Sequence, residues 1–342
     1  MMTRTTIDDV AARAGVSIKT VSRVLNDEPG VRAETRSRVR AIMIALNYHP
    51  SLPARSLAGK RSNLIGLIYD NPSAHYVFDV QNGAMAKCRD AKLRLFVLSC
   101  NDLGERAVGE VLAMAEQTHV DGLVLTPPLS ANRELIAALE ERSVPFVLVA
   151  PDEGDHGSPK VEMDDEAAAR DITGHLLSLG HRKIAFIAGH PDHHSSRLRL
   201  RGFRAALAAN GIVPDAAVVE QGFNSVQSGA HAARRILGRA DPPTAIFASN
   251  DDMAAGVLLA AHEADIEVPL QLSVAGFDDT ELAQIVWPPL TTIHQPSYDM
   301  AYAATDLLIR MVRGQDVPMV TRLDHRLVVR GSTGPVPDTS RQ

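Results

Sequence analysis

The chain lacks the features of secreted and membrane proteins. Its 342 residues include only two cysteines, Cys88 and Cys100, whose spacing fits neither a metal site nor a redox pair. No apolar run reaches the roughly 20 residues that a membrane-spanning helix needs. Charged residues interrupt the N-terminal segment where a secretory signal would carry its apolar core. These absences predict a cytoplasmic protein without a disulfide framework.

Motifs of common nucleotide-dependent and hydrolytic enzymes are also missing. The sequence contains no G-x-G-x-x-G after its first strand, no G-x-x-x-x-G-K-[ST] and no G-x-S-x-G. His190, His193 and His194 are irregularly spaced, and no Cys or Glu completes a tetrahedral set, so we expect a solvated loop there. We predict no catalytic residue, no metal and no cofactor.

Charge is divided unevenly along the chain, although the formal net charge is only −6. Residues 1–62 hold 11 lysines and arginines against 5 acidic residues, which gives a net charge of +6. The remaining residues carry a net charge of −12. A basic head on an acidic body is expected where the first segment meets phosphates and the rest does not.

Three short helices are predicted in this head. Thr6 can cap the first, with Asp9 three residues on, and Gly15 ends it. The second spans Ile18 to Leu25, and a third over Glu34 to Asn47 presents one apolar face to cover both. Two short helices joined by a glycine turn form a helix-turn-helix, whose second helix enters the major groove of DNA.

The first turns of that second helix are the predicted reading surface. Lys19 and Arg23 can donate to guanine or phosphate, whereas Ile18 offers only apolar contact. Thr20 and Ser22 lie between them. The competing interpretation is a basic, solvated helical hairpin without a DNA role.

The head and the segment after it resemble the lac repressor (LacI/GalR) family of regulators. The resemblance is carried by TIDDVAARAGVSIKTVSRVLN, VRAETRSRVR, LNYHP, ARSLAGK and IGLI, and it continues to about residue 332. It implies a hinge helix in which Leu57 wedges into the minor groove, the alternative being a plain linker leucine. It also implies operator contacts at Thr6, Ser17, Thr20, Ser22, Asn26, Thr35 and Tyr48.

Beyond Arg61 the chain alternates predicted strands and helices in two successive series. Runs such as NLIGLIYD, DGLVLTP and PFVLVA, and later KIAFIAG and TAIFASN, predict buried parallel strands. Repeated strand–helix units predict an α/β fold with two doubly wound parallel-sheet subdomains behind the all-α head. The resemblance implies the periplasmic-binding-protein type of this fold, in which the chain crosses between subdomains three times.

These patterns divide the chain into four predicted parts. They are a helix-turn-helix domain at 1–50, a hinge at 51–62, an effector-binding and dimerisation domain at 63–332 and a polar tail at 333–342. The N-subdomain covers about 63–161 and 295–323, and the C-subdomain about 162–294 and 324–332. Because the tail is short and has no leucine heptads, we predict a homodimer rather than a tetramer.

Polar side chains at strand ends are the candidates for holding a small effector. By resemblance, Arg199, Asn250 and Asp278 match the family's most regular effector contacts, and Phe223 matches a ring that stacks on the ligand. The full set of candidates is Asp70, Asn71, Thr126, Arg199, Phe223, Asn250, Asp278 and Gln295.

Three further positions are predicted around that cleft. The strand VPFVLVA ends in Ala150, where the family often carries an aspartate that binds sugar hydroxyls. Asp251 and Asp279 are expected to be N-cap residues of the helices that follow them. If the histidine loop borders the cleft, one of its histidines is expected to touch the effector.

Together these features predict a DNA-binding transcriptional regulator, a repressor of carbohydrate-utilisation genes that a sugar-like effector releases from a pseudo-palindromic operator. A ligand-activated co-repressor of the same fold is the first alternative. A solute-binding protein, an enzyme on the same α/β fold and a fusion with another nucleic-acid role are the others. The partners implied are double-stranded operator DNA, the effector and a second copy of the chain.

Overall fold

A computed structural model describes residues 5–25, 28–48, 62–100, 105–154, 157–213 and 218–336. They belong to two compact units, Met1–Asn63 and Leu64–Gln342, and each unit is described by itself. Asn26, Leu57 and nearly all of the predicted hinge lie outside the described residues.

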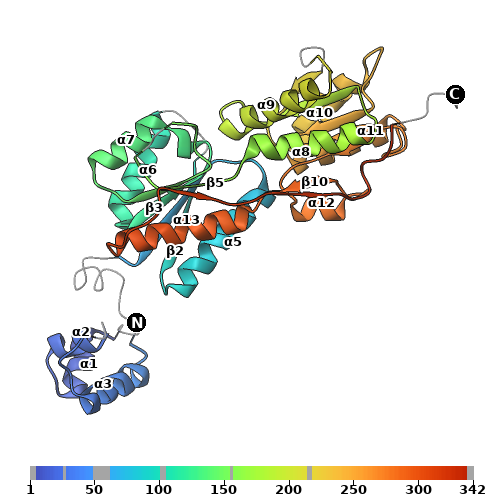
Figure 1. The fold of residues 1–342 in the computed structure, drawn as a ribbon. Helices are drawn as coiled ribbons and strands as arrows, with labels where there is room; N and C mark the ends of the chain where they lie inside the picture. The colour runs from blue at the N-terminus through green and yellow to red at the C-terminus, as the bar shows by residue number, and fades with distance from the viewer. Residues whose placement is uncertain are drawn as a thin grey trace. The chain divides into compact units, whose positions relative to one another are not determined.

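The first unit is a bundle of three helices (Figure 1). They are α1 (Ile7–Ala14), α2 (Ile18–Leu25) and α3 (Ala33–Ala45). Val10, Val21 and Val39 contribute one fully buried side chain from each helix, so the helices that are marginal alone stabilise one another. The three predicted helices are therefore confirmed. The third ends two residues before the predicted Asn47, which adopts a left-handed φ of 47°.

A capping box begins α1, as predicted. The Asp9 amide donates to Thr6 Oγ1 at 3.3 Å, and the Thr6 amide donates to the Asp9 carboxylate at 2.8 Å. We expect Thr6→Ala to destabilise the head by about 1 kcal/mol, because the Asp9 amide loses its acceptor and the Asp9 carboxylate loses the Thr6 hydroxyl, and Thr6→Ser to leave its stability nearly unchanged. Amide hydrogen exchange of residues 10–14 in the full chain measures this. Equal exchange rates in Thr6→Ala and the parent would contradict it.

The second unit is built on two parallel sheets. One has six strands in the order β11-β5-β4-β3-β1-β2, and the other has four in the order β7-β6-β8-β9. The first contains β1 (Leu64–Tyr69), β2 (Arg94–Ser99), β3 (Gly122–Leu125), β4 (Phe146–Val149), β5 (Lys160–Glu162) and β11 (Val320–Arg322). The second contains β6 (Ile184–Ala188), β7 (Val219–Gln221), β8 (Ala245–Ala248) and β9 (Ser273–Ala275).

Helices cover both faces of each sheet. On the first sheet, α5 (Ala74–Asp90) and α13 (Ser297–Val312) pack side by side, with α6 (Glu105–Thr118) and α7 (Arg133–Glu141) on the opposite face (Figure 1). Strand β3 shows why both faces need cover, since Val124 packs toward α5 and α13 while Leu123 and Leu125 pack toward α6 and α7. None of the described helices combines the length and apolar character needed to cross a membrane.

The second sheet is sandwiched in the same way. The helices α8 (Asp165–Ser178) and α9 (His194–Ala209) pack together on one face. The helices α10 (Val226–Leu237) and α11 (Asp251–Glu263) pack together on the other. The predicted α/β architecture of two doubly wound parallel sheets is therefore confirmed.

The chain passes between the two sheets three times, which joins them through three neighbouring segments. It crosses from β5 into α8, from β10 (Thr292–His294) into α13, and from β11 into β12 (Arg326–Val328). Strands β10 and β12 pair antiparallel, so two of the crossing segments are hydrogen-bonded to each other. The late segment over Ser297–Val312 returns to the first sheet, as the fold predicted from the resemblance requires.

The first residues of the predicted tail are tied to the second sheet. The Gly334 amide donates to Ser273 Oγ at 3.0 Å, and the Val336 amide donates to the Leu179 carbonyl at 3.0 Å. Residues 333–336 therefore pack on the subdomain that contains β9, although the sequence predicted a separate polar tail from residue 333.

Candidate functional site

A cleft lies where the carboxyl ends of the two sheets face each other. Asn71 follows β1 and Ala150 follows β4 on one side, while Asn224, Asn250 and Asp278 follow β7, β8 and β9 on the other. This end of a doubly wound sheet is where such folds bind ligands. The open volume is about 30 Å³, so side chains fill most of the cleft.

Arg199 on α9 is the centre of the polar network in this cleft. Its Nε donates to Asp165 Oδ1 at 2.8 Å and its Nη2 donates to Gln295 Oε1 at 2.7 Å. Its Nη1 donates to the Ser249 carbonyl at 2.6 Å. The guanidinium carbon also lies 3.5 Å from the centroid of the Phe277 ring. Hydrogen bonds in its plane and a ring on its face hold this guanidinium in one orientation.

Asp278 is the second carboxylate beside this guanidinium. Its Oδ1 lies 3.7 Å from Arg199 Nη1, and its backbone has a φ of 114°, a conformation that L residues rarely adopt. Burial raises the pKa of Asp278 well above its usual range, and the Arg199 guanidinium acts in the opposite direction. With Asp165, two carboxylates share one cation, so this part of the cleft does not favour an anionic ligand.

The expected capping role of Asp251 is wrong, because the preceding asparagine has it. Asn250 Oδ1 accepts a hydrogen bond from the Met253 amide at 2.9 Å and so caps α11. Asp251 is fully buried in the first turn, where it accepts from the Thr280 amide at 2.8 Å and from Thr292 Oγ1 at 2.7 Å. Burial raises the pKa of Asp251 to about 7. This carboxylate therefore links α11 to the loop after β9 and to β10.

Asp279 is likewise not the predicted helix cap. Thr280 precedes α12 (Glu281–Ile285), whereas Asp279 accepts from Arg330 Nη2 at 2.5 Å and lies 3.1 Å from His294 Nδ1. The two partners lie in or beside the crossing segments around β10 and β12. Both corrections have one cause, since a carboxylate at a strand end has tertiary partners that a sequence does not reveal.

The histidine loop is not fully solvated, which corrects the sequence prediction. His193 is 5% exposed and lines the cleft, because it is the N-cap residue of α9 and its ring turns inward. Its ring centroid lies 5.4 Å from that of His190, and its Nδ1 lies 3.4 Å from Asn224 Nδ2. Burial lowers the pKa of His193 to about 4, with smaller contributions from His190 and Arg199.

This lowered pKa predicts an acid-sensitive contribution to stability. Between pH 6.5 and 4 the unfolded chain binds a proton at position 193 that the folded chain does not, so stability falls as the pH falls through this window. At pH 5 we expect His193 to cost about 2 kcal/mol relative to pH 8. Urea denaturation of the parent and His193→Gln at both pH values measures the difference. An identical pH dependence in the two proteins would contradict it.

Five of the predicted effector contacts come together in the cleft. They are Asn71, Arg199, Asn250, Asp278 and Gln295. Three others lie outside its lining. Thr126 donates to the Ile68 carbonyl at 3.1 Å, Asp70 follows β1 beside the lining residue Asn71, and Phe223 is 48% exposed with its ring against His190.

Several lining residues were missed by the sequence prediction. They are Ser73, Tyr76, Pro127, Asp165, Ser195, Ser196 and Asn224. Asn224 was detectable, because it follows a strand as Asn250 does. Asp165 was not, since it begins a helix just after the chain has crossed between sheets, and such a crossing leaves no local sequence signal.

The head presents the predicted reading surface on α2. Ser17, Lys19 and Ile18 are exposed, with Ile18 at 48%, although an isoleucine would ordinarily be buried. Thr20, Ser22, Arg23 and Thr35 are half-buried, and Thr6 is exposed. Tyr48 differs from this group, since it is 7% exposed and packs in the core of the head.

Comparisons with known proteins agree with the helix-turn-helix head and with the two-sheet unit that contains the cleft. Residues 6–51 match the family model for bacterial regulatory proteins, lacI family, and residues 173–333 match that for a periplasmic binding protein-like domain. The chain is 34% identical to the catabolite control protein A of Priestia megaterium, over 96% of this chain and 99% of the relative. It is 36% identical to the ribose operon repressor of Escherichia coli K12, over 90% of this chain and 93% of that protein.

A solved structure is similar over nearly the whole chain. It is that of the lac repressor dimer bound to operator and the anti-inducer ONPF, with a TM-score of 0.84 and 33% sequence identity. The match covers 97% of this chain and 99% of the lac repressor chain.

Proposed function

The chain belongs to the lacI family of bacterial regulatory proteins, whose members regulate transcription by binding DNA, and we propose that it is a homodimeric repressor of carbohydrate-utilisation genes. Its heads bind the two half-sites of a pseudo-palindromic operator. A sugar-like effector in the cleft releases them. One observation carries this proposal: the same chain joins a basic head with an exposed α2 to a polar cleft between two sheets.

The proposed operator contacts are grouped on one part of the head. The N-terminal turns of α2 enter the major groove, where Lys19 and Arg23 donate and Ile18 meets an apolar base edge. The complete proposed set is Thr6, Ser17, Ile18, Lys19, Thr20, Ser22, Arg23, Asn26, Thr35, Tyr48 and Leu57. Because Tyr48 packs in the core, we assign it a role in holding the shape of this surface.

The proposed effector contacts are those that line the cleft. Arg199 and Asp278 supply paired donors and acceptors for sugar hydroxyls, and Asn71, Asn250 and Gln295 surround them. We retain Asp70, Thr126 and Phe223 as outer positions. No reaction is proposed for this site, since the cleft has the composition of a binding site and the relatives are regulators. We propose that the protein acts in the cytoplasm.

In this proposal the two subdomains couple effector binding to DNA binding. We propose the boundaries predicted from the sequence, about 63–161 and 295–323 for the N-subdomain and about 162–294 and 324–332 for the C-subdomain. The open volume of about 30 Å³ has room for only about one or two waters. A sugar therefore enters only if the cleft walls separate. If the bound arrangement disfavours the spacing of the hinge segments, operator is released, and operator in turn weakens effector binding.

Exposed apolar side chains on the second unit support the homodimer. Phe78 on α5 and Tyr298 on α13 lie on helices that pack side by side. Ile285 and Trp287, the latter 88% exposed, lie on and after α12. Large exposed apolar groups mark association surfaces, and a symmetric dimer buries the same surface of both copies. We propose that these two regions are the dimer contacts.

A footprinting experiment tests the proposed function. The full chain is titrated onto the control region of a neighbouring carbohydrate gene at several salt concentrations. We expect a protected pseudo-palindrome, with affinity that falls steeply as salt rises because the head releases counterions from phosphates. Moving the half-sites apart by half a helical turn is the matched DNA control and abolishes dimer binding. Protection that is independent of sequence and half-site spacing would contradict an operator-binding repressor. Tighter operator binding on adding a sugar would favour the co-repressor alternative.

A further inference from the structure

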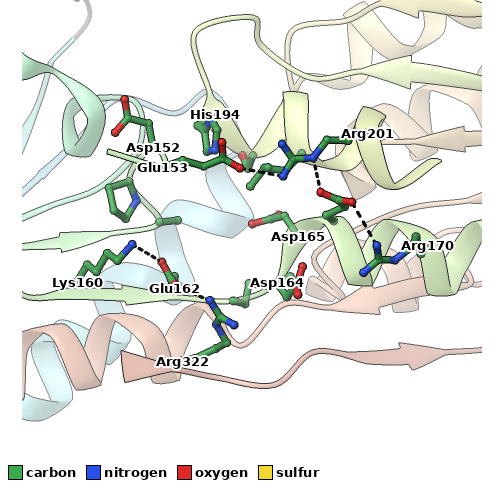
Figure 2. Close-up of a pocket in the computed structure, with 16 residues that line it drawn as sticks. Asp152, Glu153, Lys160, Glu162, Asp164, Asp165, Arg170, His194, Arg201 and Arg322 are labelled. Carbon is green, nitrogen blue, oxygen red and sulfur yellow. Dashed lines mark hydrogen bonds and ion pairs between the residues drawn. The ribbon is translucent and has the colours of Figure 1, made fainter. Parts of the chain in front are cut away.

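A second and larger cavity adjoins the cleft. Its volume is about 410 Å³, within the roughly 300–1,000 Å³ of small-molecule sites. Figure 2 shows it between the strand that ends at Glu162, the start of α8 and the start of α9. Ala150, Asp165 and Ser195 line both this cavity and the cleft. The two spaces therefore share a wall, and the outer one is far the larger.

Ala150 is the small side chain at that shared wall. Its φ is 44°, in the left-handed region that alanine rarely adopts and that aspartate, asparagine and glycine accept more easily. The backbone therefore gives no reason for an alanine here. A methyl group at this position separates the cleft from the cavity by less than a longer side chain would.

The basic side chains around the outer cavity are all paired. Lys160 Nζ lies 2.9 Å and Arg322 Nη2 2.7 Å from the Glu162 carboxylate (Figure 2). Arg201 contacts the carboxylates of Glu153 and Glu166 on the far side. The remaining lining cation, Arg170, also pairs with the Glu166 carboxylate, at 3.2 Å.

This charge balance selects the class of ligand. The lining holds six carboxylates and four basic side chains, so it is net acidic and repels a phosphate. Pro151, Met163 and Leu198 add apolar surface beside these polar groups. Paired charges, hydroxyl-binding groups and an apolar surface together suit an uncharged carbohydrate ring.

His194 adds a polar ring beside this space. His194 lines the cavity, and its Nδ1 lies 3.0 Å from Arg197 Nη2. Because a guanidinium can only donate, Nδ1 accepts and the proton of the neutral ring is on Nε2. Burial lowers the pKa of His194, which favours this neutral form. His194 Nε2 is buried and has no partner among the described residues, so it can donate to a ligand oxygen once the side chains that cover it move aside.

We propose that cleft and cavity form one continuous site, whose effector is an uncharged carbohydrate of at least two rings. One ring binds in the cleft at Arg199, and the next passes Ala150 into the outer cavity and accepts from His194. This inference rests on the proposed function and specifies its effector.

Calorimetric titration of the full chain with matched sugars tests this. The probes are glucose with cellobiose, galactose with lactose, xylose with xylobiose, and glucose 6-phosphate. We expect at least one disaccharide to bind about 10-fold or more tightly than its monosaccharide, equivalent to roughly 1.4 kcal/mol. Ala150→Asp narrows the passage and Leu198→Trp fills the outer cavity, so each reduces that ratio toward one. Ala150→Gly is the matched control, because it keeps the passage open and suits the positive φ.

Each result of these titrations either supports or overturns the extended site. A ratio near one in the parent, a ratio unchanged in both Ala150→Asp and Leu198→Trp, or tightest binding of glucose 6-phosphate would overturn the extended site. A chain that releases operator in response to a monosaccharide alone keeps the proposed function and loses this inference. A chain that binds a disaccharide with the expected ratio but shows no operator footprint keeps the extended site and loses the repressor function.

Discussion

Arg199→Ala is expected to abolish the effect of effector on operator binding and to weaken effector binding by about 100-fold or more, since a buried, hydrogen-bonded charge is removed from the site. Arg199 holds Asp165, Gln295 and the Ser249 carbonyl in place around the cleft. Its loss removes both a ligand contact and the group that orients the others. Titration of the full chain with the sugar that binds the parent, followed by operator binding with and without that sugar, measures both effects.

The same substitution is expected to lower stability. It leaves Asp165 and Asp278 buried without their cation, which costs about 3–5 kcal/mol in comparable cases. Arg199→Lys keeps a positive charge and so a more stable fold, but lacks the planar fork and should still lose the effector response. Arg204→Ala, an exposed arginine on the same helix, is the matched control and should behave as the parent does. A normal operator response in folded Arg199→Lys would remove Arg199 from the proposed site.

Leu57→Ala is expected to weaken operator binding by about 10- to 100-fold, roughly 1.4–2.8 kcal/mol, while effector binding stays intact. The reason is that the resemblance assigns Leu57 to a minor-groove wedge, and an alanine is too short to unstack a base step. Leu52→Ala, in the same segment, is the matched control. Fluorescence anisotropy with labelled operator measures the affinity, and circular permutation of the operator measures the DNA bend. Equal affinity and equal bending in Leu57→Ala and Leu52→Ala would disprove the hinge assignment.

The features that sequence predicted well are periodic or local. The burial of Val10, Val21 and Val39 follows from helical spacing, and the capping box at Thr6 needs only residues three apart. The buried strands of both sheets are continuous apolar runs, which local composition reveals. The family resemblance supplied what these patterns lack, namely the three crossings that bring residues far apart in the chain to one cleft.

The features that sequence missed depend on tertiary partners. Asp251 was expected to cap a helix, but it accepts from threonines about 30 and 40 residues later. His193 belongs to a polar, histidine-rich loop, yet the start of α9 turns its ring into the cleft. For Ala150 the resemblance predicts the missing carboxylate, but nothing in the sequence predicts the cavity behind it. A sequence does not show which space a small side chain leaves open.

The central claim, that the cleft controls the head, is tested most directly by measuring one coupling in both directions. Operator affinity is measured with and without a saturating amount of the sugar that binds most tightly, and the affinity for that sugar is measured with and without operator. We predict that sugar weakens operator binding and that operator weakens sugar binding by the same factor, at least about 5-fold, as linkage requires. Operator affinity that is unchanged when the sugar fills the cleft would contradict the account.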